Sequence, residues 1–190
     1  MNFPIKSGQA RTAGLFGLLF ILSGCSLFEK EQAQPICPTV SILSDASTVT
    51  KFQDGLGRNL IDEISRGEIK TIESSCSYES EGKTGNQNVI MSLALVIVAE
   101  RGPANRDRLA RFDYFVSVMD PERAILNKET FALQPEFSGN QTRVQFKDEP
   151  VALKIPVPQG RRGTDFRVYV GFQLSRQELE YNQRQREPGR

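Results

Sequence analysis

The sequence predicts an all-β fold, and two observations point to it. Apolar and polar residues alternate with a period of two in several short segments, most regularly at Phe166, Val168, Val170, Phe172 and Leu174. Turn residues separate these segments, and no stretch of 12 or more residues beyond position 36 carries a 3.6-residue apolar stripe. We therefore expect an antiparallel immunoglobulin-like β-sandwich of about seven to nine strands, with a partly open β-barrel as the alternative.

The expected strands are short and bounded by turn signals. They lie at 37–43, 49–52, 69–79, 89–98, 111–120, 124–133, 142–149, 151–158 and 165–174. In the third segment Ile72, Cys76 and Tyr78 share one side and the other side is polar, which is typical of a half-buried strand. The fourth is apolar on both faces except Ser92, which indicates a central strand covered on both sides. Two prolines in the eighth favour an edge strand.

The start of the chain has the three parts of a secretory signal peptide. Lys6 and Arg11 are the only charged residues before Cys25, and the run 13–22 is apolar. Small residues follow, as they do at a signal-peptidase site. Ten apolar residues cannot span about 30 Å of hydrocarbon at 1.5 Å per residue, so a membrane-spanning helix is disfavoured.

The four residues that end this run, Leu22-Ser23-Gly24-Cys25, resemble the lipobox of bacterial lipoproteins. The resemblance implies cleavage before Cys25, a thioether-linked diacylglycerol on its sulfur and an N-acyl chain on its new amino group. No other cofactor is expected. Two or three acyl chains anchor a protein stably to a membrane, whereas one does so marginally. Ser26 follows where an aspartate would retain the protein in the inner membrane, so the resemblance implies the periplasmic face of the outer membrane, with the inner membrane as the alternative.

The other two cysteines form an even set once Cys25 is acylated. An exported, oxidising compartment favours a disulfide between Cys37 and Cys76. Closing a loop of about 40 residues would stabilise the fold by roughly 4 kcal/mol in the chain-entropy model. The alternative is two free buried thiols.

Composition argues against catalysis and against nucleic acid. The chain has no histidine, which removes histidine-based triads and histidine metal ligands, and no metal site is expected. The aspartates and glutamates lie mostly in turns or on outward strand faces, so carboxylate catalysis is a minor alternative. With 24 basic and 23 acidic residues, the chain has no strong field to attract nucleic acid.

One basic cluster could contact an anionic partner. Arg101, Arg106, Arg108 and Arg111 lie within one loop and the start of the next strand. They could face the phosphates of lipid or lipopolysaccharide, or a carboxylate-rich partner. The favoured interpretation is a solvated loop, balanced by nearby acidic residues. Arg161-Arg162 in a glycine-flanked loop is interpreted in the same way.

Beyond the lipobox, the layout resembles small envelope lipoproteins of Gram-negative, alphaproteobacterial type. The similar parts are Cys37-Pro38, Ser75-Cys76-Ser77-Tyr78, Arg101-Gly102-Pro103 and Val170-Gly171-Phe172-Gln173-Leu174. This resemblance implies no activity.

The expected organisation follows from these observations. It comprises a cleaved signal peptide (1–24), a lipidated N-terminus and linker (25–36), a β-sandwich (37–175) and a polar C-terminal tail (176–190) that could form one or two helical turns. The leading hypothesis is a non-enzymatic envelope lipoprotein that binds another envelope protein or has a structural role. The alternative is a carrier or sensor of a lipid or small apolar ligand, which would need a cavity of several hundred Å³.

Overall fold

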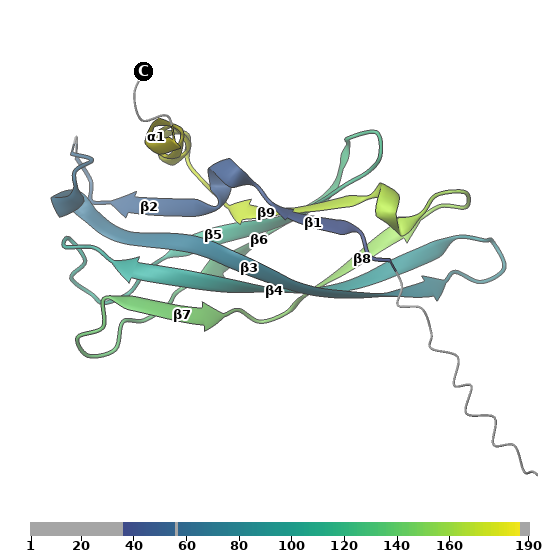
Figure 1. Cartoon of the computed structure of the whole chain (residues 1–190), viewed down its shortest axis with the longest axis horizontal. Helices are drawn as coiled ribbons and strands as arrows, with labels where there is room; N and C mark the ends of the chain where they lie inside the picture. Colours follow the sequence, from purple (N-terminus) through teal and green to yellow (C-terminus); the bar gives the residue numbers. More distant parts are fainter. Residues whose placement is uncertain (1–35, 56, 187–190) are drawn as a thin grey trace, which may run out of the picture. The chain divides into compact units, whose positions relative to one another are not determined.

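The computed structural model describes residues 36–55 and 57–186, so the expected signal peptide and Cys25 lie outside the described residues (Figure 1). The described residues form nine strands and one α-helix. The strands are β1 (Thr39–Ile42), β2 (Thr48–Phe52), β3 (Glu63–Ser80), β4 (Gln87–Arg101), β5 (Phe112–Met119), β6 (Ile125–Leu133), β7 (Arg143–Lys147), β8 (Val151–Val157) and β9 (Arg167–Phe172). The helix is α1 (Arg176–Arg186). No helix in this part of the chain is long and apolar enough to cross a membrane.

The strands make two sheets, and neither sheet closes on itself. One has the order β1-β9-β5-β6, and the other has the order β2-β3-β4-β7 with β8 also paired to β4. One cluster of buried apolar side chains joins both sheets, including Phe112 and Phe172 from the first and Leu95 and Ile97 from the second. The prediction of an all-β fold is confirmed, and the arrangement of the two sheets is sandwich-like, with neither sheet closed into a barrel.

The pairing is antiparallel with one exception. β1 runs parallel to β9, with Thr39 opposite Arg167 and Ile42 opposite Val170. The expectation of antiparallel neighbours throughout is therefore corrected at this edge. Residue alternation reports which side chains are buried, but it carries no information on the direction of the neighbouring strand.

β3 begins at Glu63, six positions before the strand start expected from the sequence. Its first inward positions are Glu63, Ser65 and Gly67, which are polar or have no side chain and so hide the period of two. The glycine is required by packing, because a Cβ at Gly67 would lie 2.9 Å from Phe172 and 3.2 Å from Phe112. The absence of a side chain at Gly67 leaves room for the rings of Phe112 and Phe172. A search for alternating apolar residues does not recognise a buried glycine as an inward position.

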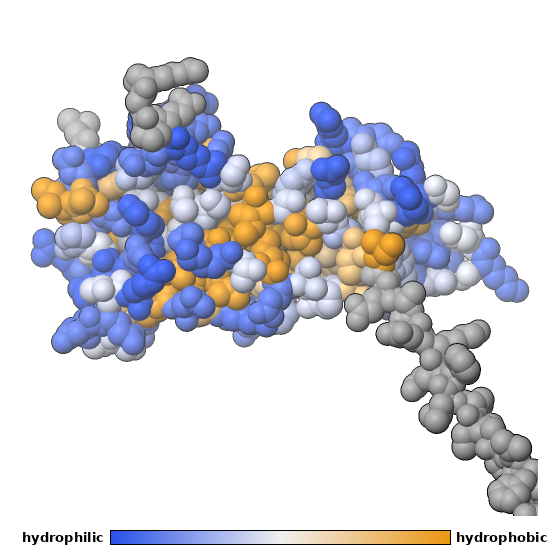
Figure 2. Space-filling model, viewed as in Figure 1, coloured by the Kyte–Doolittle hydropathy of each residue, from blue (hydrophilic) through white to orange (hydrophobic). Residues whose placement is uncertain are grey.

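β4 is the central strand of its sheet, as predicted. Its inward side chains, including Leu93 and Leu95, are fully buried, and the outward Ala94 and Val98 are also almost completely buried. No described layer packs on the outer face. Instead an ion pair between Lys147 of β7 and Glu73 of β3 crosses β4, so long polar side chains shield the apolar strand. Figure 2 shows apolar side chains in the middle of this face, bordered by polar ones.

The C-terminal segment, for which one or two helical turns were expected, forms the 11-residue helix α1, and this helix packs on the domain. Asn182 is buried and donates hydrogen bonds to the carbonyl oxygens of Asp45 (2.9 Å) and Thr48 (2.8 Å). Tyr181 packs edge-on against Phe52 with ring centroids 5.1 Å apart. α1 has no apolar stripe, so its attachment by polar groups left no periodic signal in the sequence.

The N-terminus of α1 carries a capping box. The Glu178 backbone N–H donates to Ser175 Oγ (3.3 Å), and the Ser175 backbone N–H donates to the Glu178 carboxylate (2.7 Å). Burial alone would raise the pKa of Glu178. Its hydrogen bonds from Lys51 and Ser175 outweigh that effect and lower the pKa below the usual value. The carboxylate thus stays ionised and joins the helix to β2 through Lys51 at 2.7 Å.

Candidate functional sites

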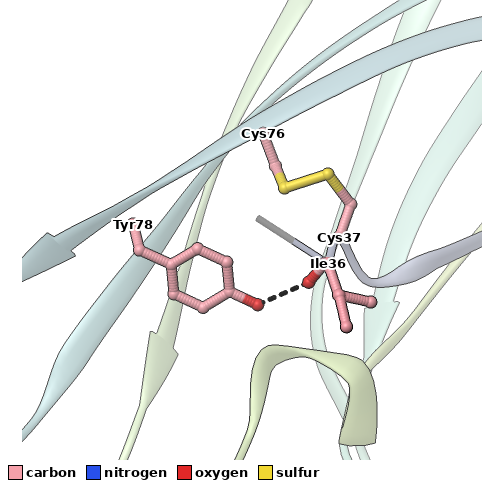
Figure 3. Close-up of a disulfide and its surroundings, with 4 residues drawn as sticks. All are labelled: Ile36, Cys37, Cys76 and Tyr78. Carbon is pink, nitrogen blue, oxygen red and sulfur yellow. Dashed lines mark hydrogen bonds between the residues drawn. A yellow bond between two sulfur atoms is a disulfide. The ribbon is translucent and has the colours of Figure 1, made fainter. Parts of the chain in front are cut away.

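A disulfide fixes the point at which the N-terminal segment leaves the domain. Cys37, just before β1, is bonded to Cys76 of β3 in the other sheet, with Cα atoms 5.7 Å apart (Figure 3). The structure thus contains the pairing expected from the sequence. Beside it, the Tyr78 hydroxyl donates a 2.7 Å hydrogen bond to the carbonyl oxygen of Ile36. Two contacts therefore hold the first described residues to β3.

Three loops lie at this end of the domain, which we call the Cys37 end. They are the β3–β4 hairpin, the β8–β9 loop and the β5–β6 turn (Figure 1). Gln159 packs on Gly85, which joins the first two. A Cβ at Gly163 would lie 2.2 Å from the Tyr78 hydroxyl, so the β8–β9 loop also packs directly on the tyrosine.

The four arginines singled out from the sequence lie at the opposite end. Arg101 is paired with Ser65 at the start of β3, whereas Cys76 is paired with Met91. Ten residues of β4 separate those positions, which corresponds to about 33 Å at 3.3 Å per residue. The arginine loop and the start of the described chain therefore lie at different ends of the domain.

The structure places the four arginines in and beside one loop, but two of them already have partners within that loop. The Arg101 guanidinium donates to the Asn105 carbonyl oxygen (3.0 Å), and Arg111 forms an ion pair with Asp107 (2.7 Å). The hydrogen bond from Arg111 lowers the pKa of Asp107, and the Leu109 N–H lowers it further. Arg106 and Arg108 are exposed. Part of the cluster therefore interacts with its own loop.

Asn105, which the sequence reasoning missed, organises this loop. It is 4% exposed, its amide donates to the Leu109 carbonyl oxygen (2.8 Å), and its side-chain oxygen accepts from the Arg108 N–H (2.8 Å). Arg108 has a positive φ of 58°. An asparagine that bonds local backbone groups is a common loop device, but the sequence alone does not show that this one is buried.

A cleft opens between the two sheets near the Arg101 end. Its volume is about 390 Å³, and both sheets line it, β2 and β3 from one and β5 and β6 from the other. Phe52, Leu109 and Leu133 form part of its apolar wall. Ser65 lies on its floor, fully buried, with a hydroxyl that has no hydrogen-bond partner in the structure.

A second concavity lies at the Cys37 end, and we call it the arginine cavity. It has a volume of about 740 Å³ and is lined by Arg123, Arg161, Arg167, Asp120, Asp165 and Tyr169, among others. The Arg162 backbone N–H lowers the pKa of Asp165, and the Arg162 and Arg161 side chains lower it further against the opposing effect of burial. Sequence reasoning recognised only the Arg161-Arg162 pair, because Asp120 and Arg123 come from the distant β5–β6 turn and Arg167 from β9.

β6 is the longest described strand that pairs with only one neighbour. It pairs only with β5, and its first six side chains are exposed. Ile125 is 61% exposed and Leu126 is 47% exposed. Among the other strands with one neighbour, β1 has four residues, β7 five and β8 seven, and β2 contacts α1. β3 also has a free edge beyond Glu68, where its pairing with β2 ends. Edge strands that proteins do not protect are potential pairing surfaces for another chain.

Comparison with known proteins adds no assignment. No protein-family model, curated protein or solved structure matches this chain.

Proposed function

We propose that this chain is a non-enzymatic, lipid-anchored protein of the bacterial envelope whose immunoglobulin-like sandwich binds an extended segment of another envelope protein along β6. The observation that carries the binding proposal is the uncovered nine-residue edge of β6 with two exposed aliphatic side chains. An added strand would satisfy the outward backbone groups of β6, and the exposed Ile125 and Leu126 side chains would supply apolar contacts to the partner.

The anchor is proposed to be acylated Cys25, which would hold the domain on the periplasmic face of the outer membrane. Eleven residues separate Cys25 from Cys37, so the Cys37 end would lie within about 40 Å of the membrane even if the linker were fully extended. The disulfide and the Tyr78 hydrogen bond make the attachment point part of the domain. The linker would therefore restrict how far β6 can reach from the membrane.

Site-specific photocrosslinking in intact envelopes tests β6 as the binding edge. A photoreactive residue at Asn127 or Glu129 is expected to give one discrete crosslinked product, because both side chains are exposed on this edge strand. The matched control is Gln145, which is exposed on β7 of the other sheet and should give no such product.

A Leu126→Lys variant sharpens the same test. It should abolish the Asn127 crosslink while leaving the thermal unfolding midpoint nearly unchanged, because the side chain is already half exposed. Equal labelling from Gln145 and Asn127, or labelling that persists unchanged in Leu126→Lys, would count against β6.

The cleft near the Arg101 end favours a second candidate function, a carrier or sensor of a small apolar ligand. Its volume of about 390 Å³ lies within the range of ligand pockets, and its walls are largely apolar. The unpartnered Ser65 hydroxyl would supply one hydrogen bond to fix the orientation of a ligand.

Filling the cleft tests this second candidate with a defined probe, anilinonaphthalene sulfonate. Ala132 lines the cleft and is exposed, so Ala132→Trp should reduce the fluorescence enhancement of the bound dye at least fivefold. The control is Ala152→Trp, which places the same indole at an exposed site on β8. A dye signal that is absent from the unmodified protein, or equal in the two variants, would rule out binding in the cleft.

A further inference from the structure

The arginine cavity combines positive charge with a concave surface. Arg123 enters it from the β5–β6 turn, Arg161 from the β8–β9 loop and Arg167 from the first position of β9. Arg167 is paired with Met119, the last residue of β5, so the sheet fixes the position of the guanidinium stem. Two regions distant in sequence, the β5–β6 turn and the stretch from the β8–β9 loop into β9, thus bring three arginines to one space.

The acidic groups around this cavity already have partners. Asp120 accepts a hydrogen bond from the Ala124 N–H (2.7 Å), and Glu122 forms an ion pair with Arg161. Asp165 accepts hydrogen bonds from the backbone and the guanidinium of Arg162 at 2.9 and 3.1 Å. These carboxylates therefore neutralise Arg161 and Arg162 or cap their own turns.

Two guanidinium groups remain without such a partner. Within the described residues, neither Arg123 nor Arg167 forms an ion pair or a side-chain hydrogen bond. Thr164 and Tyr169 add hydroxyl groups to the wall. Two unpaired guanidinium groups beside hydroxyl donors suit a tetrahedral oxyanion, because the planar fork of arginine matches the oxygens of a phosphate group.

The cavity lies at the end of the domain from which the N-terminal segment leaves. A chain of contacts connects the start of the described chain to the cavity. Ile36 accepts a hydrogen bond from Tyr78, and Tyr78 packs on Gly163 of the β8–β9 loop. Arg161 of the same loop forms an ion pair with Glu122 of the β5–β6 turn. The loops that carry the cavity and the start of the described chain lie together in Figure 1. A segment of this length would keep the cavity near any surface to which Cys25 was attached.

We propose that the arginine cavity is a binding site for a phosphate group, with Arg123 and Arg167 as the residues that contact its oxygens. The chemistry of the site suits either the headgroup of an anionic phospholipid or a free phosphate. The choice of a lipid headgroup rests on the proposed membrane attachment through Cys25, whereas the phosphate site itself does not.

Titration of the mature full-length protein in a non-ionic detergent tests the site without a membrane. Three probes are compared: inorganic phosphate, dihexanoyl phosphatidylglycerol and dihexanoyl phosphatidylcholine. The readout is the NMR signal of the arginine Nε–H groups. Either Arg123→Gly or Arg167→Gln should weaken binding of an anionic probe at least tenfold, because each removes a charge-assisted contact.

Arg123 and Arg108 provide a matched pair of variants. They are the two non-glycine residues with positive φ in the described chain, at 69° and 58°. Glycine tolerates such angles, so Arg123→Gly and Arg108→Gly each remove one charge without imposing strain. Arg108→Gly, at the opposite end of the domain, should leave the affinity unchanged.

Each outcome has a defined meaning. Binding of phosphatidylglycerol but not of inorganic phosphate supports the site and assigns the lipid headgroup as its ligand. Comparable binding of inorganic phosphate supports the site and assigns the free anion. Absence of binding by both anionic probes, or equal affinity in Arg123→Gly and Arg108→Gly, overturns the proposal. Because short-chain probes in detergent need no anchor, this result is independent of whether Cys25 is acylated.

Discussion

Replacing both Cys37 and Cys76 with alanine is expected to lower the free energy of unfolding by about 4 kcal/mol. The disulfide closes a loop with a sequence separation of 39 residues, so its loss restores much conformational freedom to the unfolded chain. It also releases β1, a four-residue edge strand that pairs only with β9 among the described strands. Urea unfolding of the two proteins at equal concentration measures the difference.

The local and global effects of losing the disulfide can be measured separately in the double cysteine variant. Amide hydrogen exchange in β1 should accelerate more than exchange in β4, because the disulfide joins the segment before β1 to the other sheet. Ser75→Ala, at an exposed position beside Cys76, is the control and should change stability by less than about 0.5 kcal/mol. A loss below about 1 kcal/mol in the double cysteine variant would show that the disulfide contributes little to stability.

The strands that were predicted best are those in which large apolar side chains occupy the buried positions. In β9, Val168, Val170 and Phe172 are buried and their neighbours are mostly polar, so a period of two reports the fold directly. β4 was predicted equally well, because its length and apolar content indicate a central strand. In both strands the same physical quantity, apolar burial, determines the sequence pattern and the structure.

Prediction failed where a small or polar residue occupies an inward position. The first half of β3 places Ser65 and Gly67 in buried positions, and at Gly67 a larger side chain would collide with Phe112 and Phe172. The full length of α1 and its packing on the domain were not predicted for a related reason, since the helix is attached through Asn182 rather than through an apolar stripe. Its capping box, Ser175 to Glu178, was the available sequence signal.

The two arginine groups show what sequence proximity can indicate about a site. Arg101 to Arg111 are close in sequence, so a common loop balanced by nearby acidic residues such as Asp107 was predictable. The specific pairing of Arg111 with Asp107 and the contact of Arg101 with the Asn105 carbonyl oxygen became evident only in the structure. The arginine cavity could not be predicted, because strand pairing of β5 with β9 brings Arg167 to the turn that contains Arg123. The site depends on the register between β5 and β9, and this register cannot be deduced from a single sequence.

Replacing Cys25 with alanine is expected to move almost all of the protein from the membrane fraction to the soluble envelope fraction. The mature chain would lose every acyl group, and each buried methylene contributes about 0.8 kcal/mol to membrane binding. The alanine variant of Cys37 and Cys76 is the control, because it keeps the lipobox and should stay in the membrane fraction. Fractionation followed by immunoblotting compares the three proteins.

The most direct measurement for the central proposal is the intact mass of the mature N-terminal peptide from purified envelopes. The proposal of a lipid-anchored protein predicts a peptide that begins at Cys25 and carries the added mass of a diacylglycerol group and an N-acyl chain. A mature chain that begins at another residue, or a peptide with an unmodified Cys25 thiol, would contradict the proposed anchor.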